Sequence, residues 1–203
     1  EPPPRKADGT WEQFLLVAQS FDLAFVDDPK KAEIQRSAWN VCHTLGMDRY
    51  GNLHVLHIDR NRGKNPTEID DWIIMCAFTH EPDVQIIERN HAGHVHVHTV
   101  VSNTNISVIS HDTGANKHHN VEGIPGLQRP FEDGKIILYC GAGPSREKAL
   151  GLVHELHAYP ARPNDRVMSF WIGWFRMRKL MRRLKAQLAA ATKRARILEE
   201  IQK

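Results

Sequence analysis

Histidines are the most conspicuous chemical groups in this chain of 203 residues. Thirteen are present, and eight of them fall between His80 and His119. Imidazole is a common ligand of transition metals, and its pKa lies close to neutral pH. We therefore expect any metal binding or acid–base chemistry to involve this part of the chain.

The strongest pattern in that region is a histidine at every second position, followed by β-branched residues. Alternation of this kind predicts a strand over residues 95–101, in which side chains two positions apart share one face of the sheet. Two imidazoles about 7 Å apart on one face can reach the same divalent cation at roughly 2.1 Å. The pattern predicts a site for Mg²⁺, Mn²⁺ or Zn²⁺, and the alternative is the solvent-facing side of an edge strand. The candidate ligands are His94, His96 and His98.

The same segment resembles a known family. Residues His96 to Asn103 resemble the third motif of HUH endonucleases, and most closely that of the relaxases of conjugative and mobilisable plasmids. Two further stretches are similar to relaxase sequences, namely Thr113 to Asn120 downstream and His57-Ile58-Asp59 upstream. The resemblance covers about residues 30–120, and it implies metal-dependent nicking and strand transfer on single-stranded DNA.

The resemblance also implies ligands and a nucleophile. In the family a further histidine lies seven residues before the HxH pair, where this chain has Arg89, so the third ligand would be His91, Glu88 or His57. The family's nucleophile is a tyrosine near the N-terminus, and no tyrosine lies there in this chain. Tyr139 is the preferred substitute because it ends a predicted strand that could lie beside the histidines, and Tyr50 is the second. Attack by either would leave a 5′-phosphotyrosine.

The C-terminal segment carries most of the positive charge. Residues 176–203 contain ten Lys and Arg against two Glu, whereas residues 1–175 have a net charge of −5. Basic residues at this density predict binding to phosphates of nucleic acid. The aromatic residues just before them could stack on bases or dock another protein. The candidate cations are Arg176, Arg178, Lys179, Arg182, Arg183 and Lys185, and the aromatic residues are Trp171, Trp174 and Phe175.

Two other functions are compatible with these features. One is a non-enzymatic nucleic-acid-binding or assembly protein that works through the basic segment. The other is a phosphoesterase of the PHP type, because His96 to Ser102 also resembles the opening HxHTxxS motif of that family. The second alternative implies a large βα barrel. Cleavage that depends on a divalent metal would distinguish an enzyme from a binding protein.

Periodicity and turn residues predict an α+β fold with a mostly antiparallel central sheet flanked by helices, followed by a long basic C-terminal helix. A helix running into a strand is expected over residues 11–25. The predicted helices are 29–45, 65–78, 145–157 and 167–203, and the predicted strands are 51–59, 84–88, 95–101, 106–109 and 135–140. The expected organisation is a flexible arm at 1–10, a catalytic or metal-binding domain at 11–160 and the basic helix at 166–203.

Composition narrows the class of protein. Hydrophobic residues make up 41% of the chain, which is enough for a buried core. The longest apolar run without charge, Val167 to Phe175, has nine residues, whereas a bilayer span needs about twenty. Three irregularly spaced cysteines predict neither a disulfide framework nor a zinc-binding CxxC pair. We therefore expect no transmembrane segment and a cytoplasmic location.

Overall fold

The computed structural model describes residues 11, 13–24, 39–89, 93–141, 143–161 and 164–201. The predicted arm at 1–10 and most of the predicted helix at 29–45 lie outside these ranges. No helix in the described part of the chain is both long and apolar enough to cross a bilayer.

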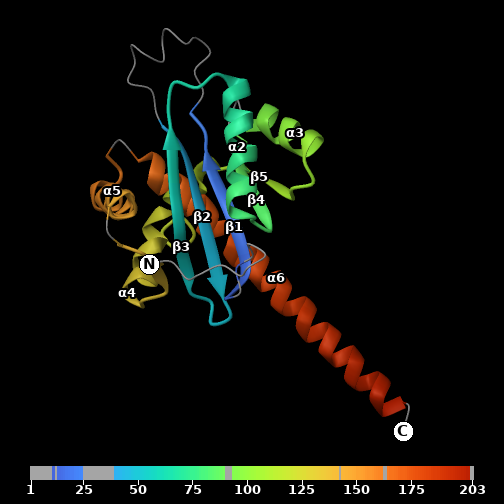
Figure 1. Ribbon diagram of the computed structural model, residues 1–203. Coiled ribbons are helices and arrows are strands. Elements are labelled where there is room, and N and C mark those ends of the chain that lie inside the picture. The colour runs from blue at the N-terminus through green and yellow to red at the C-terminus, as the bar shows by residue number, and fades with distance from the viewer. Residues whose placement is uncertain are drawn as a thin grey trace.

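A six-stranded sheet forms the centre of the protein (Figure 1). The strands lie in the spatial order β5-β4-β1-β2-β3-β6. Two of the five pairings are antiparallel, and the three that involve β4, β5 and β6 are parallel. The predicted fold class is confirmed, although the sheet is mixed rather than mostly antiparallel. An open sheet of this order also excludes the large βα barrel that a PHP-type enzyme would need. The strands are β1 (Phe14–Asp22), β2 (Asn40–Asp48), β3 (Leu53–Asn61), β4 (Val84–Glu88), β5 (Val108–His111) and β6 (Ile136–Leu138).

Helices cover both faces of the sheet. On one face, α2 (Pro66–His80) and α3 (Gly93–Asn103) bury a cluster that includes Phe21 and Ile87 of the strands. On the other face, the first half of α6 (Asp165–Ile201) packs with η2 (Ile124–Leu127), α4 (Gln128–Glu132) and α5 (Pro144–Ala158) over the larger core. A short helix, η1 (Gly114–His118), follows β5.

Local signals explain why α2 begins where it does. Asn65 caps the helix, its side chain accepts from the backbone N–H of Glu68, and the Glu68 carboxylate accepts from the backbone N–H of Asn65. This reciprocal pair is a capping box, and Pro66 occupies the first turn. The buried amide of Gln19 then joins the helix to the sheet, because it donates to the carbonyl of Cys76 at 2.8 Å.

Three predicted elements are wrong. Residues 93–103 form helix α3 rather than a strand, and there His96 and Val100, one helical turn apart, are the buried positions. The interior surface made by α2 and β4 decides this outcome, because tertiary packing overrides the β propensity of valine. Residues 40–45 belong to strand β2 and not to a helix, and the segment at 11–25 contributes strand β1 with no helix in its described residues.

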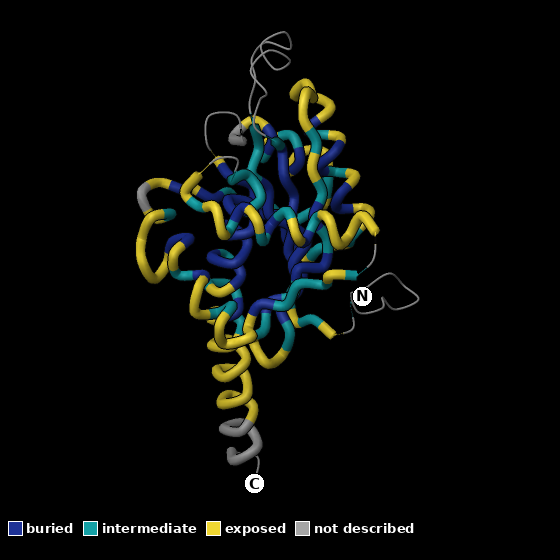
Figure 2. The backbone as a smooth tube through the Cα atoms, turned by 90° about the vertical axis from the view of Figure 1, so that its left-hand side faces the viewer, coloured by how far each residue is buried: buried dark blue, intermediate teal, exposed yellow. Residues whose placement is uncertain are grey.

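Helix α6 has two different halves. From Val167 to Met181 its apolar residues are part of the core, whereas residues 185–195 are exposed (Figure 2). The predicted docking role of Trp171, Trp174 and Phe175 is wrong, because these side chains are between 0% and 7% exposed and pack inside the protein. Gly173 permits this close approach, since a Cβ there would lie 2.3 Å from a methyl group of Leu45.

Candidate active site

Two carboxylates meet at the carboxyl ends of the central parallel strands. Strand β1 pairs with β4 so that Phe21 lies beside Ile87, which brings the next residues, Asp22 and Glu88, side by side. Both lie on the α6 face of the sheet, two positions after Ser20 and Ile86. Their side chains are joined by a hydrogen bond.

A third carboxylate comes from the first turn of α6. Asp165 accepts a hydrogen bond from the backbone N–H of Trp39 at 3.2 Å. The beginning of the helix is fixed by its neighbour Arg166, whose guanidinium and backbone N–H both bind Glu155 of α5. The positive end of the helix dipole also favours the ionised form of a carboxylate at this position. We call Asp22, Glu88 and Asp165 the carboxylate site.

Crowding of negative charge changes the protonation of this site. The pKa of Asp22 is raised well above its usual value, first because the side chain is buried and then because Glu88 and Asp165 are close to it. The cation of Lys117, in η1, acts in the opposite direction. Such a group of carboxylates is stable only when a proton or a bound cation offsets part of its charge.

Polar groups at the end of β5 and just after it support the site from one side. The Thr113 hydroxyl donates to the carboxylate of Glu88, and both side chains are buried. Beside Glu88 in the β4–β5 register lies His111, which accepts from the guanidinium of Arg176 at 2.9 Å. Burial and this guanidinium lower the pKa of His111 to about 4, so its ring is neutral at physiological pH.

The donor set fits a hard divalent cation. Carboxylate oxygens are the ligands that Mg²⁺ and Mn²⁺ prefer, and the contact between the Asp22 and Glu88 side chains marks the place that a cation would take. Among the described residues, no three His, Cys, Asp or Glu side chains already meet in the geometry of a metal site. The hydrogen-bonded pair of Asp22 and Glu88 is therefore the preformed part of the metal site, and the carboxylate of Asp165 would have to move closer to this pair.

The predicted histidine ligands do not lie at the carboxylate site, and they do not share one face of a strand. In α3, residues 96 and 98 are separated by roughly 200° around the helix, which places them on opposite sides. His96 is buried and its Nδ1 lies 2.6 Å from a carboxylate oxygen of Asp70, whereas His98 is exposed. His57 is on β3 with its ring against His80. His91 and the side chain of His94 lie outside the described parts.

The predicted tyrosines lie away from the carboxylates. Tyr139 follows β6, which is three strands from β1, so roughly 14 Å separates the two strands before any offset along them. Its hydroxyl donates to Nδ1 of His54 at 2.6 Å, and Nε2 of His54 lies 3.2 Å from Asp48. Burial, and then the charge of Asp48, raise the pKa of Tyr139. Tyr50 is an exposed residue of the β2–β3 turn.

The predicted basic residues occupy both halves of α6. Arg176 is bound to His111 and to the carbonyl of Ser110. The exposed cations are Arg178, Arg182, Arg183 and Lys185. Arg178 and Lys179 lie over the rings of Trp174 and Phe175. Contact with nucleic acid by Arg182, Arg183 and Lys185 stays a prediction.

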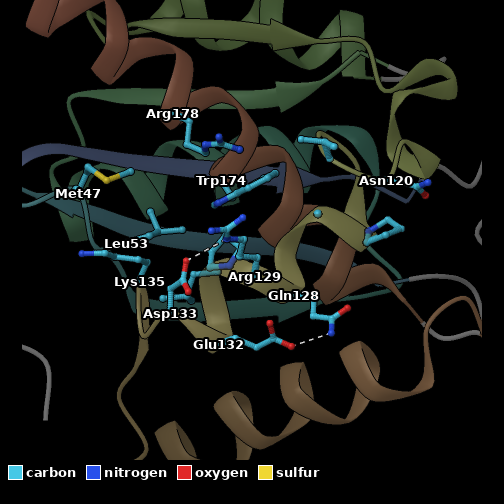
Figure 3. A pocket seen from close by; sticks show the side chains of 16 residues that line it. Met47, Leu53, Asn120, Gln128, Arg129, Glu132, Asp133, Lys135, Trp174 and Arg178 are labelled. Atoms are coloured by element: carbon cyan, nitrogen blue, oxygen red, sulfur yellow. Dashed lines mark hydrogen bonds and ion pairs between the residues drawn. The ribbon is translucent and has the colours of Figure 1, made fainter.

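A groove of about 640 Å³ lies at the opposite end of the sheet from the carboxylates (Figure 3). Met47 and Leu53 of the β2–β3 hairpin line it, together with Trp174 and Arg178 of α6. Its acidic side chains are already engaged, since Asp133 pairs with Arg129 and Glu132 accepts from Gln128. Unlike Asp22 and Glu88, these two carboxylates are engaged by other side chains and not by each other.

Sequence reasoning missed two of the three carboxylates and their common location. Glu88 was named only as one possible third ligand for the histidines. One signal was available, because Asp22 and Glu88 each end an apolar β-branched or aromatic run. That signal is weak when the pairing of the strands is unknown.

The comparisons with known proteins support the fold. No protein-family model and no curated protein sequence matches the chain. Among solved structures it is similar to the large terminase nuclease of the thermophilic phage G20c with bound zinc, with a TM-score of 0.56, 12% identity, and coverage of 80% of this chain and 84% of that one. It is also similar to the Fowlpox virus Holliday junction resolvase, with a TM-score of 0.49, 15% identity, and coverage of 81% and 99%. Its TM-score with Thermus thermophilus RuvC is 0.45, at 10% identity and with coverage of 79% of this chain and 92% of that one.

The chain thus shares its fold with this terminase nuclease. The comparisons do not support the relaxase family specifically. Because α3 replaces the predicted histidine strand, the feature on which that resemblance depended is missing from the structure.

Proposed function

We propose that this chain is a divalent-metal-dependent endonuclease that cuts DNA, with Asp22, Glu88 and Asp165 as the metal ligands. The observation that carries the proposal is the hydrogen-bonded contact between Asp22 and Glu88 at the ends of two paired parallel strands, where crowded negative charge raises the pKa of Asp22 and favours a bound cation. The likeness in fold to a terminase nuclease supports the same conclusion.

The surrounding residues have defined tasks in this proposal. The Thr113 hydroxyl orients Glu88, and the Trp39 N–H orients Asp165. Lys117 contributes positive charge where a phosphate would arrive. When bound, divalent cations would stabilise negative charge on the scissile phosphate and lower the pKa of an attacking water.

The test is cleavage of labelled duplex, branched and single-stranded DNA in EDTA, Mg²⁺ and Mn²⁺. We expect cleavage only with metal, and a loss of at least a hundredfold, about 2.7 kcal/mol of transition-state stabilisation, in Asp22→Asn and Glu88→Gln. Asp112→Asn is the matched control, because Asp112 is an exposed carboxylate nearby that pairs with Arg89. Equal cleavage by all three variants, or cleavage in EDTA, would refute the proposal.

A second candidate function is favoured by one specific contact. The hydrogen-bond chain from Tyr139 through His54 to Asp48 has the donor order of a hydroxyl activated by an oriented base. Strand transfer through Tyr139 would leave DNA covalently attached to the protein, and a denaturing gel detects this adduct. Neither adduct nor cleavage, with DNA binding intact, would leave a non-enzymatic binding protein.

A further inference from the structure

Two arginines converge on one tryptophan beside the carboxylate site. The guanidinium carbon of Arg60 lies 4.2 Å from the centre of the Trp39 ring, and that of Arg62 lies 4.8 Å from it. The backbone N–H of the same tryptophan donates to Asp165. Trp39 therefore contacts both guanidinium groups through its ring and the carboxylate of Asp165 through its backbone.

The sheet register explains why these residues meet. Asn40 pairs with Asn61 at the end of the β2–β3 ladder, so Trp39 stands next to the end of β3. Arg60 lies in β3 and Arg62 directly after its last residue, and their spacing of two positions places both on one face of the extended chain. It is the α6 face, because Ile58 of the same alternation is buried in the core under α6.

Arg60 and Arg62 add exposed positive charge to this edge. In the described parts of the chain neither Arg60 nor Arg62 forms a salt bridge, and both are exposed. Glu155, the acidic residue nearest to Arg60 on the neighbouring α5, is already bound to Arg166. The carboxylate of Asp59 is also engaged, by Trp72 and Lys148.

Two guanidinium groups held against one ring, neither in a salt bridge with any described residue, repel each other, so their arrangement favours an anionic ligand. Stacking on the indole fixes the guanidinium planes and leaves their N–H groups available for phosphate oxygens. We propose that Trp39, Arg60 and Arg62 form an arginine clamp for the phosphodiester backbone of DNA, a few nucleotides from the cleaved bond. This inference rests on the proposed nuclease function.

The test compares Arg60→Ala/Arg62→Ala with Arg49→Ala. Arg49 is a matched control, because it lies over the ring of Tyr50 at the far end of the same hairpin. Binding of a labelled DNA duplex is measured in EDTA over a range of KCl concentrations. We expect the slope of log K against log salt to fall by about 1.8 in the double variant, as for two lost phosphate contacts, and to be unchanged in Arg49→Ala.

Cleavage kinetics give a second readout. Because the clamp binds substrate away from the reacting atoms, KM should rise about tenfold while the single-turnover rate at saturating DNA stays within about twofold. Arg60→Lys/Arg62→Lys should restore most of the salt slope, which a merely structural role would not predict. Unfolding temperatures identify any variant that is misfolded.

The outcomes separate this inference from the proposed function. A wild-type protein that cuts DNA, with a double variant indistinguishable from Arg49→Ala, would overturn the clamp alone. If the wild type binds DNA without cutting it, and the double variant lowers the slope, the clamp is supported while the nuclease proposal fails. Absence of DNA binding by the wild type would overturn both.

Discussion

The imidazole of His43 should make the stability of this protein depend on pH in a measurable way. His43 lies on β2 beneath α6, is fully buried, and has its Nδ1 3.1 Å from the hydroxyl of Ser169. That hydroxyl donates its hydrogen to the carbonyl of Ser20, so it must accept from Nδ1–H. Within the described structure Nε2 has no hydrogen-bond partner.

Protonation of Nε2 would therefore bury a charge without compensation. Burial, and then the positive charge of Arg166, lower the pKa of His43 from 6.5 to about 3. Since the unfolded chain takes up this proton near pH 6.5 and the folded one only near pH 3, stability decreases as pH falls through this window. At about 1.4 kcal/mol per unit, the loss at pH 4 is about 3 kcal/mol.

Urea unfolding of the wild type, His43→Asn and His98→Asn at pH values from 7 to 4 tests this reasoning. Asparagine keeps a donor near the position of Nδ1 but does not titrate. The difference in unfolding free energy between wild type and His43→Asn should shrink by about 3 kcal/mol over this range, because all other titrating groups are common to both proteins. His98→Asn, an exposed control, should run parallel to the wild type. Parallel curves for His43→Asn would show that the ring is not held neutral by burial.

Three further predictions concern other parts of the molecule. Gly173→Ala should lower the unfolding free energy by about 1–3 kcal/mol in urea titrations, because the new Cβ would overlap Leu45 beneath α6; an unchanged midpoint would mean that the helix shifts freely. Tyr139→Phe should leave metal-dependent DNA cleavage within about twofold of wild type, and a larger loss would favour tyrosine chemistry instead. The third prediction replaces three exposed cations of α6 by alanine, namely Arg182, Arg183 and Lys185. The slope of log K against log salt for duplex binding should fall by up to about 2.7, whereas an unaltered slope would place the DNA elsewhere.

Local signals in the sequence were sufficient for several elements. Asn65, Pro66 and Glu68 predict the beginning of α2, because capping depends only on residues within one turn. The apolar runs at β3, β4 and β6 and the long basic helix were also predicted close to their observed positions. These features depend on contacts between near neighbours, so the sequence determines them almost by itself.

Alternation alone could not decide the conformation of residues 93–103. His96 and Val100 are four positions apart. This spacing is expected for two residues on one face of a helix, and also for two residues on one face of a strand. The deciding contacts are with Asp70 on α2 and with the core beneath it, and these belong to distant parts of the chain. Of the histidines that predicted a metal site, His96 therefore lies on the buried side of a helix and His98 on its exposed side.

The candidate active site was decided by tertiary structure. Asp22, Glu88 and Asp165 are 66 and 77 positions apart in the sequence, and each looks like an ordinary acidic residue at the end of an element. They come near one another because β1 and β4 pair in parallel and because α6 begins over the same end of the sheet. Parallel pairing needs a long crossover and leaves no short-range pattern, so the sequence determined the residues and only the fold made them a site.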